Sequence, residues 1–119
     1  MIAVERILIV EDEPLISMML EDFLDIIGKK VVASADSVAS ALAALEANEV
    51  DAAILDVNLR AGEKSTPIAE ALAARDIPFV FASGGSGEGV DERFRDRPQL
   101  QKPFTMDGVE KALAGLSDR

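Results

Sequence analysis

Short apolar runs alternate with amphipathic segments along the whole chain. Most of the runs are rich in β-branched, small or other apolar residues, which is typical of strands that are buried on both faces of a parallel sheet. The sequence predicts strands in five places, over residues 7–10, 30–33, 50–56, 77–82 and 98–101.

Between these runs, apolar residues recur three or four positions apart, as they do on one face of a helix. The first helix is predicted to begin at Pro14 and to end at Gly28, because proline suits a first turn and glycine a helix end. We expect its apolar stripe to face the core, and the stripe consists of Leu15, Met18, Met19, Phe23, Ile26 and Ile27.

Three further segments have caps and stripes that predict helices. One is capped by Asp36 or Ser37 and ends at Asn48, and the next opens at Ser65 or Thr66 and runs to about Ala74. The last is capped by Thr105, and its expected core face consists of Met106, Val109, Leu113 and Leu116.

The segment after the fourth strand has a different composition. Residues 84–89 include glycines at 84, 85, 87 and 89, which predicts a flexible loop, and residues 90–95 form at most a short helix. The glycine-rich segment lacks the residue spacing of a phosphate-binding loop. Strands that alternate with helices predict right-handed crossovers and a doubly wound parallel α/β sheet.

Composition narrows the classes of function. The chain has 119 residues, and we expect one domain over residues 1–119 with no output domain. It has no cysteine and no histidine, so disulfides and thiolate chemistry are excluded and any metal must bind to oxygen. A net charge of −10 argues against nucleic-acid binding. The apolar N-terminal run is too short for a signal peptide or membrane span, so we expect a cytoplasmic protein without membrane insertion.

Four polar residues end apolar runs: Asp12, Asp56, Ser83 and Lys102. Taken singly, each has an ordinary structural explanation, such as a helix cap, a turn or a surface lysine. The carboxyl ends of the strands in an open parallel sheet lie at one edge, where ligands bind. We therefore expect the four residues to converge there, together with Glu11 beside Asp12.

Several carboxylates at one edge repel each other unless a cation is present, and a hard divalent ion such as Mg²⁺ fits oxygen ligands. Asp12, Asp56 and the backbone carbonyl of Asn58 would supply the protein's share of these ligands. Lys102 adds a positive charge and Ser83 a hydroxyl, which together indicate a site for phosphoryl transfer. Asp56 would be the nucleophile that forms an acyl phosphate. No general base for hydrolysis is evident, which favours a slow switch over a fast enzyme.

Four segments in this order resemble the receiver domain of two-component response regulators: ILIVEDEP at 7–14, Asp56, FASG at 81–84 and KPF at 102–104. The resemblance covers essentially the whole chain. It implies a flavodoxin-like five-stranded sheet of order 2-1-3-4-5. It also implies Asp56 as phosphoacceptor, Glu11 and Asp12 as the magnesium-binding pair, Ser83 as switch hydroxyl and Lys102 as the phosphate-pairing lysine. A cis Lys102–Pro103 bond is implied as well.

The segment PFVFASG at 78–84 further resembles the FAT GUY group of single-domain receivers. Typical receivers place Tyr or Phe three residues before the lysine, whereas this chain has Gln99 there and no Tyr or Trp. The usual aromatic readout of phosphorylation therefore cannot operate in its standard form. An order–disorder change of residues 84–95 is the hypothesis that replaces it.

The sequence thus predicts a phosphoacceptor switch that is not an enzyme in the turnover sense, with self-catalysed phosphorylation and slow autodephosphorylation. A histidine kinase would donate the phosphoryl group to Asp56 with Mg²⁺. The signal would pass to a downstream protein partner or a phosphotransfer protein in a phosphorelay.

Two alternatives remain open. The first is a magnesium phosphohydrolase of the haloacid-dehalogenase type, although such enzymes carry an aspartate where this chain has Asn58. The second is a phosphorylation-silent receiver that acts only as a binding module. The retained acids and lysine argue against this second alternative.

Overall fold

The computed structural model describes residues 5–57, 59, 64–83, 99–101 and 104–117. Of Ser83, Gln99, Gln101 and Ser117 it describes the backbone alone. The described residues form strands β1 (Arg6–Val10), β2 (Lys30–Ala35), β3 (Ala52–Asp56), β4 (Phe79–Ser83) and β5 (Gln99–Gln101). They also form helices α1 (Pro14–Ile26), α2 (Val38–Ala47), α3 (Thr66–Ala74) and α4 (Met106–Ser117).

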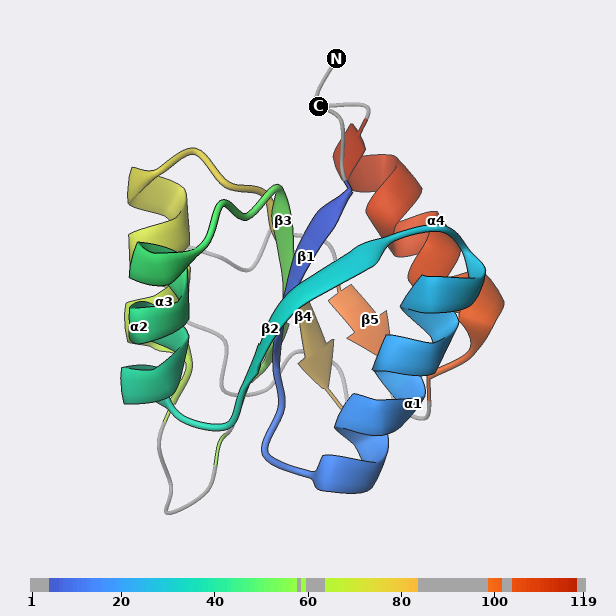
Figure 1. Ribbon diagram of the computed structural model, residues 1–119, viewed down its shortest axis with the longest axis horizontal. Helices are drawn as coiled ribbons and strands as arrows, with labels where there is room; N and C mark the ends of the chain where they lie inside the picture. The colour runs from blue at the N-terminus through green and yellow to red at the C-terminus, as the bar shows by residue number, and fades with distance from the viewer. Residues whose placement is uncertain (1–4, 58, 60–63, 84–98, 102–103, 118–119) are drawn as a thin grey trace.

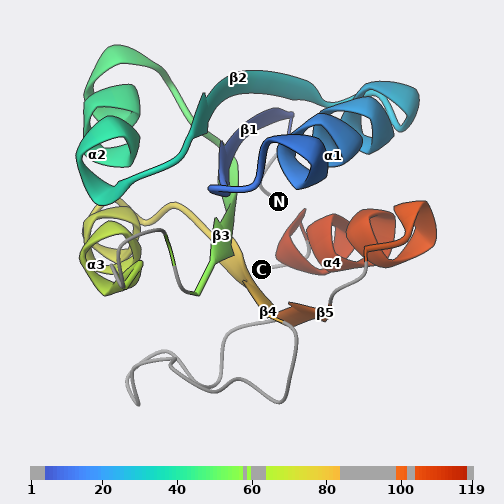
Figure 2. The same ribbon diagram turned by 90° about the horizontal axis from the view of Figure 1, so that it is seen from below.

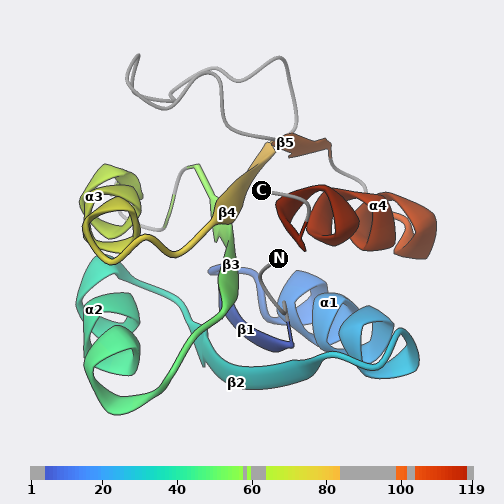
Figure 3. The same cartoon turned by 90° about the horizontal axis from the view of Figure 1, so that it is seen from above.

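The strands form one parallel sheet in the order β2-β1-β3-β4-β5, with β1 and β3 as neighbours. Helices α2 and α3 cover one face and helices α1 and α4 cover the other (Figure 1). The two layers of helices are separated by the sheet in both perpendicular views (Figures 2 and 3). The predicted parallel α/β architecture is confirmed, and the observed strand order matches the one that the resemblance implies.

Alternate residues of each central strand enter different cores, because successive side chains of a strand point to opposite faces. Leu8, Leu55 and Phe81 pack on the side of α2 and α3. Their neighbours Ile9 and Ile54 pack on the side of α1 and α4. The apolar runs lack a polar face because both faces of the sheet are covered.

The helix ends follow mostly from local chemistry. Ser37 caps α2, and the backbone N–H of Ser40 donates to its hydroxyl at 3.1 Å. The N–H of Gly108 donates to the hydroxyl of Thr105 at 3.0 Å at the start of α4. After α1, Gly28 has a φ of 83°, a left-handed conformation that glycine adopts without steric cost. Among the described helices, none is long and apolar enough to cross a membrane.

The predicted core face of α1 is partly wrong. Leu15, Met18 and Ile26 are 77%, 58% and 67% exposed. The buried positions of this helix are instead Ser17, Leu20 and Leu24. Apolar residues surround most of the helix, so periodicity alone did not determine which face meets the sheet. The helix packs on the sheet through the face that contains Leu20 and Leu24.

Smaller corrections concern the ends of the elements. Strand β2 extends to Ala35, two residues beyond the predicted end, because it stays paired with β1 as far as Val10. Strand β3 begins at Ala52, two residues after the predicted start, and the side chain of the preceding residue, Asp51, binds Arg6. Met106 is 39% exposed, while the rest of the predicted core face of α4 is buried. The predicted loop at 84–89 and short helix at 90–95 lie outside the described residues.

Candidate functional site

The ends of β1 and β3 place three acidic residues side by side. Val10 is the last residue of β1, and it is paired with Leu55 in the neighbouring strand. Glu11 and Asp12 follow β1 directly, and Asp56 is the last residue of β3. The register of two parallel strands therefore brings residues from distant parts of the sequence to one edge of the sheet.

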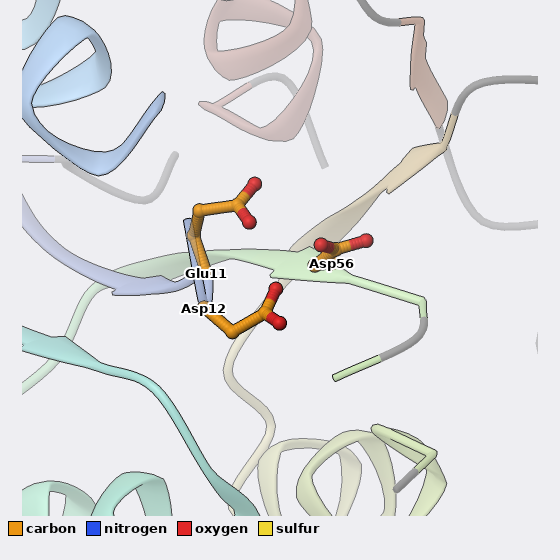
Figure 4. Close-up of side chains that lie close together, drawn as sticks. All are labelled: Glu11, Asp12 and Asp56. Carbon is orange, nitrogen blue, oxygen red and sulfur yellow. The ribbon is translucent and has the colours of Figure 1, made fainter. Parts of the chain in front are cut away.

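The three carboxylates form a compact cluster. One oxygen from each of Glu11, Asp12 and Asp56 lies within 4.8 Å of the others. The close-up shows the side chains converging from the two strand ends (Figure 4). Glu11 and Asp56 are only 4% and 8% exposed, and Asp12 is partly exposed. The cluster is thus reached from solvent on the side of Asp12.

Burying like charges near one another costs free energy, because the carboxylates repel each other. A bound divalent cation reverses the sign of this interaction. The donor set consists of carboxylate oxygens alone, which suits a hard ion such as Mg²⁺ or Ca²⁺ better than a soft one. The residues that are present therefore fit the magnesium ion that the sequence led us to expect.

The acidic pair after β1 is held by hydrogen bonds of the backbone. The N–H of Glu11 donates to the carbonyl of Ala35 in β2 at 2.9 Å, which continues the ladder of the sheet. Its side chain turns toward α1, where Oε2 accepts the N–H of Glu13 at 3.1 Å. Glu11 therefore has a fixed backbone and a carboxylate that contacts both the cluster and the helix start.

The chain after Asp56 is anchored by a residue to which the sequence assigned a different role. Ser65 was predicted as a possible helix cap, but its side chain makes no cap hydrogen bond. Its N–H and hydroxyl instead donate to the carbonyl of Val57 at 3.2 and 3.3 Å. Ser65 is 1% exposed. A buried serine before a helix is ambiguous in sequence, so only the fold reveals that it fixes the residue after Asp56.

The other predicted site residues are described less fully. Ser83 is the last residue of β4, where Asp56 is paired with its neighbour Ala82. Its backbone therefore reaches the same edge as the acidic cluster, while its side chain lies outside the described part of the structure. Asn58, Lys102 and the Lys102–Pro103 bond also lie outside it. The structure thus brings together three of the predicted side chains: Glu11, Asp12 and Asp56.

Asp51, which follows α2, differs from these acids in its electrostatic surroundings. It accepts the N–H groups of Glu5 and Arg6 at 3.1 and 2.8 Å, and Nη2 of Arg6 at 2.9 Å. The hydrogen bond from the Arg6 guanidinium holds the pKa of the Asp51 carboxyl below its usual range. The carboxyls of Asp51 and Glu49 in turn raise the pKa of Arg6. This second charged group lies at the amino end of β1, away from the acidic cluster.

Comparisons with known proteins agree with this geometry. The chain is 72% identical to SdrG from Sphingomonas melonis Fr1, and 98% of each chain is covered with a TM-score of 0.87. A BeF3-activated conformation of SdrG from Pseudomonas melonis Fr1 matches at 72% identity, with 98% of each chain covered and a TM-score of 0.83.

A more distant match is the response regulator PhyR from Brucella abortus, at 30% identity and a TM-score of 0.79. It covers 97% of this chain and 48% of the PhyR chain. The comparison with curated protein sequences found no match.

A search against protein families matches residues 7–114 to the response regulator receiver domain. The matched range runs from the second residue of β1 into α4 and contains the three residues of the acidic cluster. Together with the parallel sheet and the 72% sequence identity to SdrG, this match establishes that the chain belongs to the response regulator receiver domain family.

Proposed function

We propose that this receiver domain is a phosphorylation-controlled switch in which Asp56 accepts a phosphoryl group. The observation that carries the proposal is the convergence of Glu11, Asp12 and Asp56 within 4.8 Å at the carboxyl edge of the sheet. Asp56 is the member that ends a central strand: it is paired with Ala82 of β4, and Leu55 just before it is paired with Val10 of β1, so its backbone position is fixed by the sheet. A nucleophile needs such a fixed position relative to the attacked atom.

The proposed reaction transfers a phosphoryl group from a phosphohistidine of a histidine kinase. A carboxylate oxygen of Asp56 forms the new P–O bond while the P–N bond of the donor breaks. The leaving imidazole nitrogen takes up a proton, and the product on Asp56 is an acyl phosphate. Hydrolysis of this acyl phosphate is slow, because no general base was found in the sequence. The protein therefore acts as a switch rather than as an enzyme with rapid turnover.

Glu11, Asp12 and Asp56, with the backbone carbonyl of Asn58, are the proposed magnesium ligands. Mg²⁺ would offset the repulsion among the carboxylates and the charge on the phosphoryl oxygens. Ser83 is proposed as the switch hydroxyl and Lys102 as the cation that pairs with the phosphate. The end of β4 next to β3 is consistent with the role of Ser83, since it brings the backbone of Ser83 to the edge that bears Asp56.

The similarity to SdrG supports a change of conformation on activation. SdrG is described in a BeF3-activated conformation, and the chain shares 72% of its residues with that protein. We propose that phosphorylation of Asp56 changes the surface of this chain in a related way. The added charge of about −1.5 to −2 would lie at an edge that is already acidic, and repulsion among these charges would favour a rearrangement.

We further propose that the domain signals in the cytoplasm through another protein, either a downstream partner or a phosphotransfer protein. The net charge of −10 supports a protein partner over nucleic acid.

The experiment is intact-protein mass spectrometry after incubation with Mg²⁺ and acetyl phosphate. We expect a single phosphoryl adduct, which is lost in Asp56→Asn and when the cation is chelated. The matched control is Asp22→Asn, because Asp22 is an exposed aspartate on α1 outside the cluster. This control should retain the adduct.

The same experiment distinguishes the remaining alternatives. Catalytic turnover of phosphate esters would indicate a phosphohydrolase of the haloacid-dehalogenase type. Absence of both adduct and turnover in the folded protein would indicate a silent binding module. An adduct that persists in Asp56→Asn would show that another residue is the phosphoacceptor.

A further inference from the structure

The carboxylate of Glu11 takes part in two parts of the structure. It is one of the three groups of the acidic cluster, with an oxygen within 4.8 Å of those of Asp12 and Asp56. Its Oε2 also accepts the backbone N–H of Glu13 at 3.1 Å. Because Glu11 is 4% exposed, solvent does not screen either interaction strongly.

Glu13 is the N-cap residue just before α1, and its side chain makes no cap hydrogen bond. The first N–H groups of a helix have no partners within the helix and need acceptors from elsewhere. Glu11 supplies such an acceptor just before the first turn. In the same turn, the N–H of Ser17 donates to the carbonyl of Glu13 at 3.0 Å.

A second contact fixes this turn to the sheet. The hydroxyls of Ser17 and Ser34 lie 2.6 Å apart, which joins α1 to β2. The turn between these anchors presents Leu15 to solvent, with 77% of the residue exposed, and Met18 follows with 58% exposed. A change at Glu11 therefore acts on a short, well-anchored segment that bears two exposed apolar side chains.

We propose that Glu11 is a positioning residue that transmits cation occupancy of the acidic cluster to the first turn of α1. The proposal rests on the proposed function, because it requires the cluster to bind a divalent cation. A cation at the cluster withdraws negative charge from the same carboxylate that accepts the N–H of Glu13. The hydrogen bond at the start of α1 must then change in strength, and the change reaches Ser17 through the carbonyl of Glu13.

Asp12 gives a matched comparison, since it belongs to the same cluster while Glu11 holds the bond to the N–H of Glu13. Glu11→Gln keeps the length of the side chain and an oxygen for the N–H of Glu13, but it removes the charge that responds to the cation. Asp12→Asn removes one charge from the same cluster and leaves Glu11 intact. Both variants should bind Mg²⁺ more weakly than the wild type, by a factor of about 10 or more.

The test is a Mg²⁺ titration of the isotope-labelled protein followed by NMR. The amide of Val57, next to Asp56, reports occupancy independently of α1, so the variants are compared at equal response of Val57. In the wild type and in Asp12→Asn, the amides of Glu13 and of residues 15–17 should shift together with Val57. In Glu11→Gln, most of the shift at Glu13 and residues 15–17 should be lost.

A full wild-type shift of these amides in Glu11→Gln would overturn the proposed link, while leaving the proposed function intact. Absence of any Mg²⁺ response at Val57 in the wild type would instead overturn both. Amides just after the far end of α1, at Ile27 and Gly28, are the internal control. An equal shift there would show a movement of the whole helix rather than an effect that starts at Glu11.

Discussion

Charged side chains are arranged differently at the two ends of the central strands. At the amino end of β1, the Arg6 guanidinium binds the carboxylates of Asp51 and Glu49. At the carboxyl end, Glu11, Asp12 and Asp56 bring three carboxylates together. The first group joins opposite charges and strengthens the fold. The second gathers like charges at a cost in stability, which is the arrangement expected where a ligand supplies the opposite charge.

The largest expected effect is at the amino end. Asp51→Ala removes the acceptor of two backbone N–H groups and of the Arg6 guanidinium. We expect a loss of about 2 kcal/mol in the free energy of unfolding, because hydrogen bonds to a charged group are stronger than neutral ones. Urea denaturation measures the loss. In the matched control Glu49→Ala, the removed carboxylate is 84% exposed and the change should stay below about 1 kcal/mol.

The charge of Asp51 also makes part of this stability depend on pH. Its pKa is lowered in the folded protein by the Arg6 guanidinium. A lowered folded-state pKa stabilises the fold above the unfolded pKa of about 3.9, and this contribution is lost as the pH falls through the folded-state value. Between neutral pH and pH 2, the free energy of unfolding should therefore fall less in Asp51→Asn than in the wild type. Parallel curves would show that the ion pair contributes nothing.

At the carboxyl end, removing a charge should have the opposite sign. Without divalent cations, Asp12→Asn relieves repulsion in the acidic cluster and should raise the free energy of unfolding by about 1 kcal/mol. Added Mg²⁺ should stabilise the wild type more than the variant, because a ligand that binds the folded state raises its stability. Thermal unfolding with and without Mg²⁺ tests both statements. If Asp12→Asn is less stable than the wild type in Mg²⁺-free buffer, the carboxylates of the acidic cluster do not destabilise the fold, and the two ends do not differ as described.

The smallest effect is expected for an ion pair that belongs to neither group. Nζ of Lys111 lies 3.2 Å from Oδ2 of Asp107 on α4, with both side chains more than 70% exposed (78% and 72%). Exposed pairs of this spacing contribute a few tenths of a kcal/mol. Lys111→Ala should therefore change the unfolding free energy by less than about 0.5 kcal/mol in urea denaturation. A larger loss would mean that solvent screens the charges on this exposed surface only weakly.

The sequence predicted the acidic cluster better than it predicted the packing of the helices. Asp56 ends an apolar run and Glu11 follows another, and parallel strands place both at the same edge whatever the details of packing. The paired charges of Arg6 and Asp51 left no such pattern, since the two residues are distant in sequence and separately resemble ordinary surface residues. Their contact depends on the neighbouring positions of β1 and β3 in the sheet.

The sequence by itself determined the alternation of strands and helices and the strand end that bears Asp56, because side-chain periodicity and capping are local properties. Tertiary structure alone decided which face of α1 is buried and left Leu15 and Met18 in solvent. It also decided that the Glu11 carboxylate meets both the cluster and the N–H of Glu13. These features depend on contacts between separate elements, and the geometry of such contacts is set only when the helix packs on the sheet.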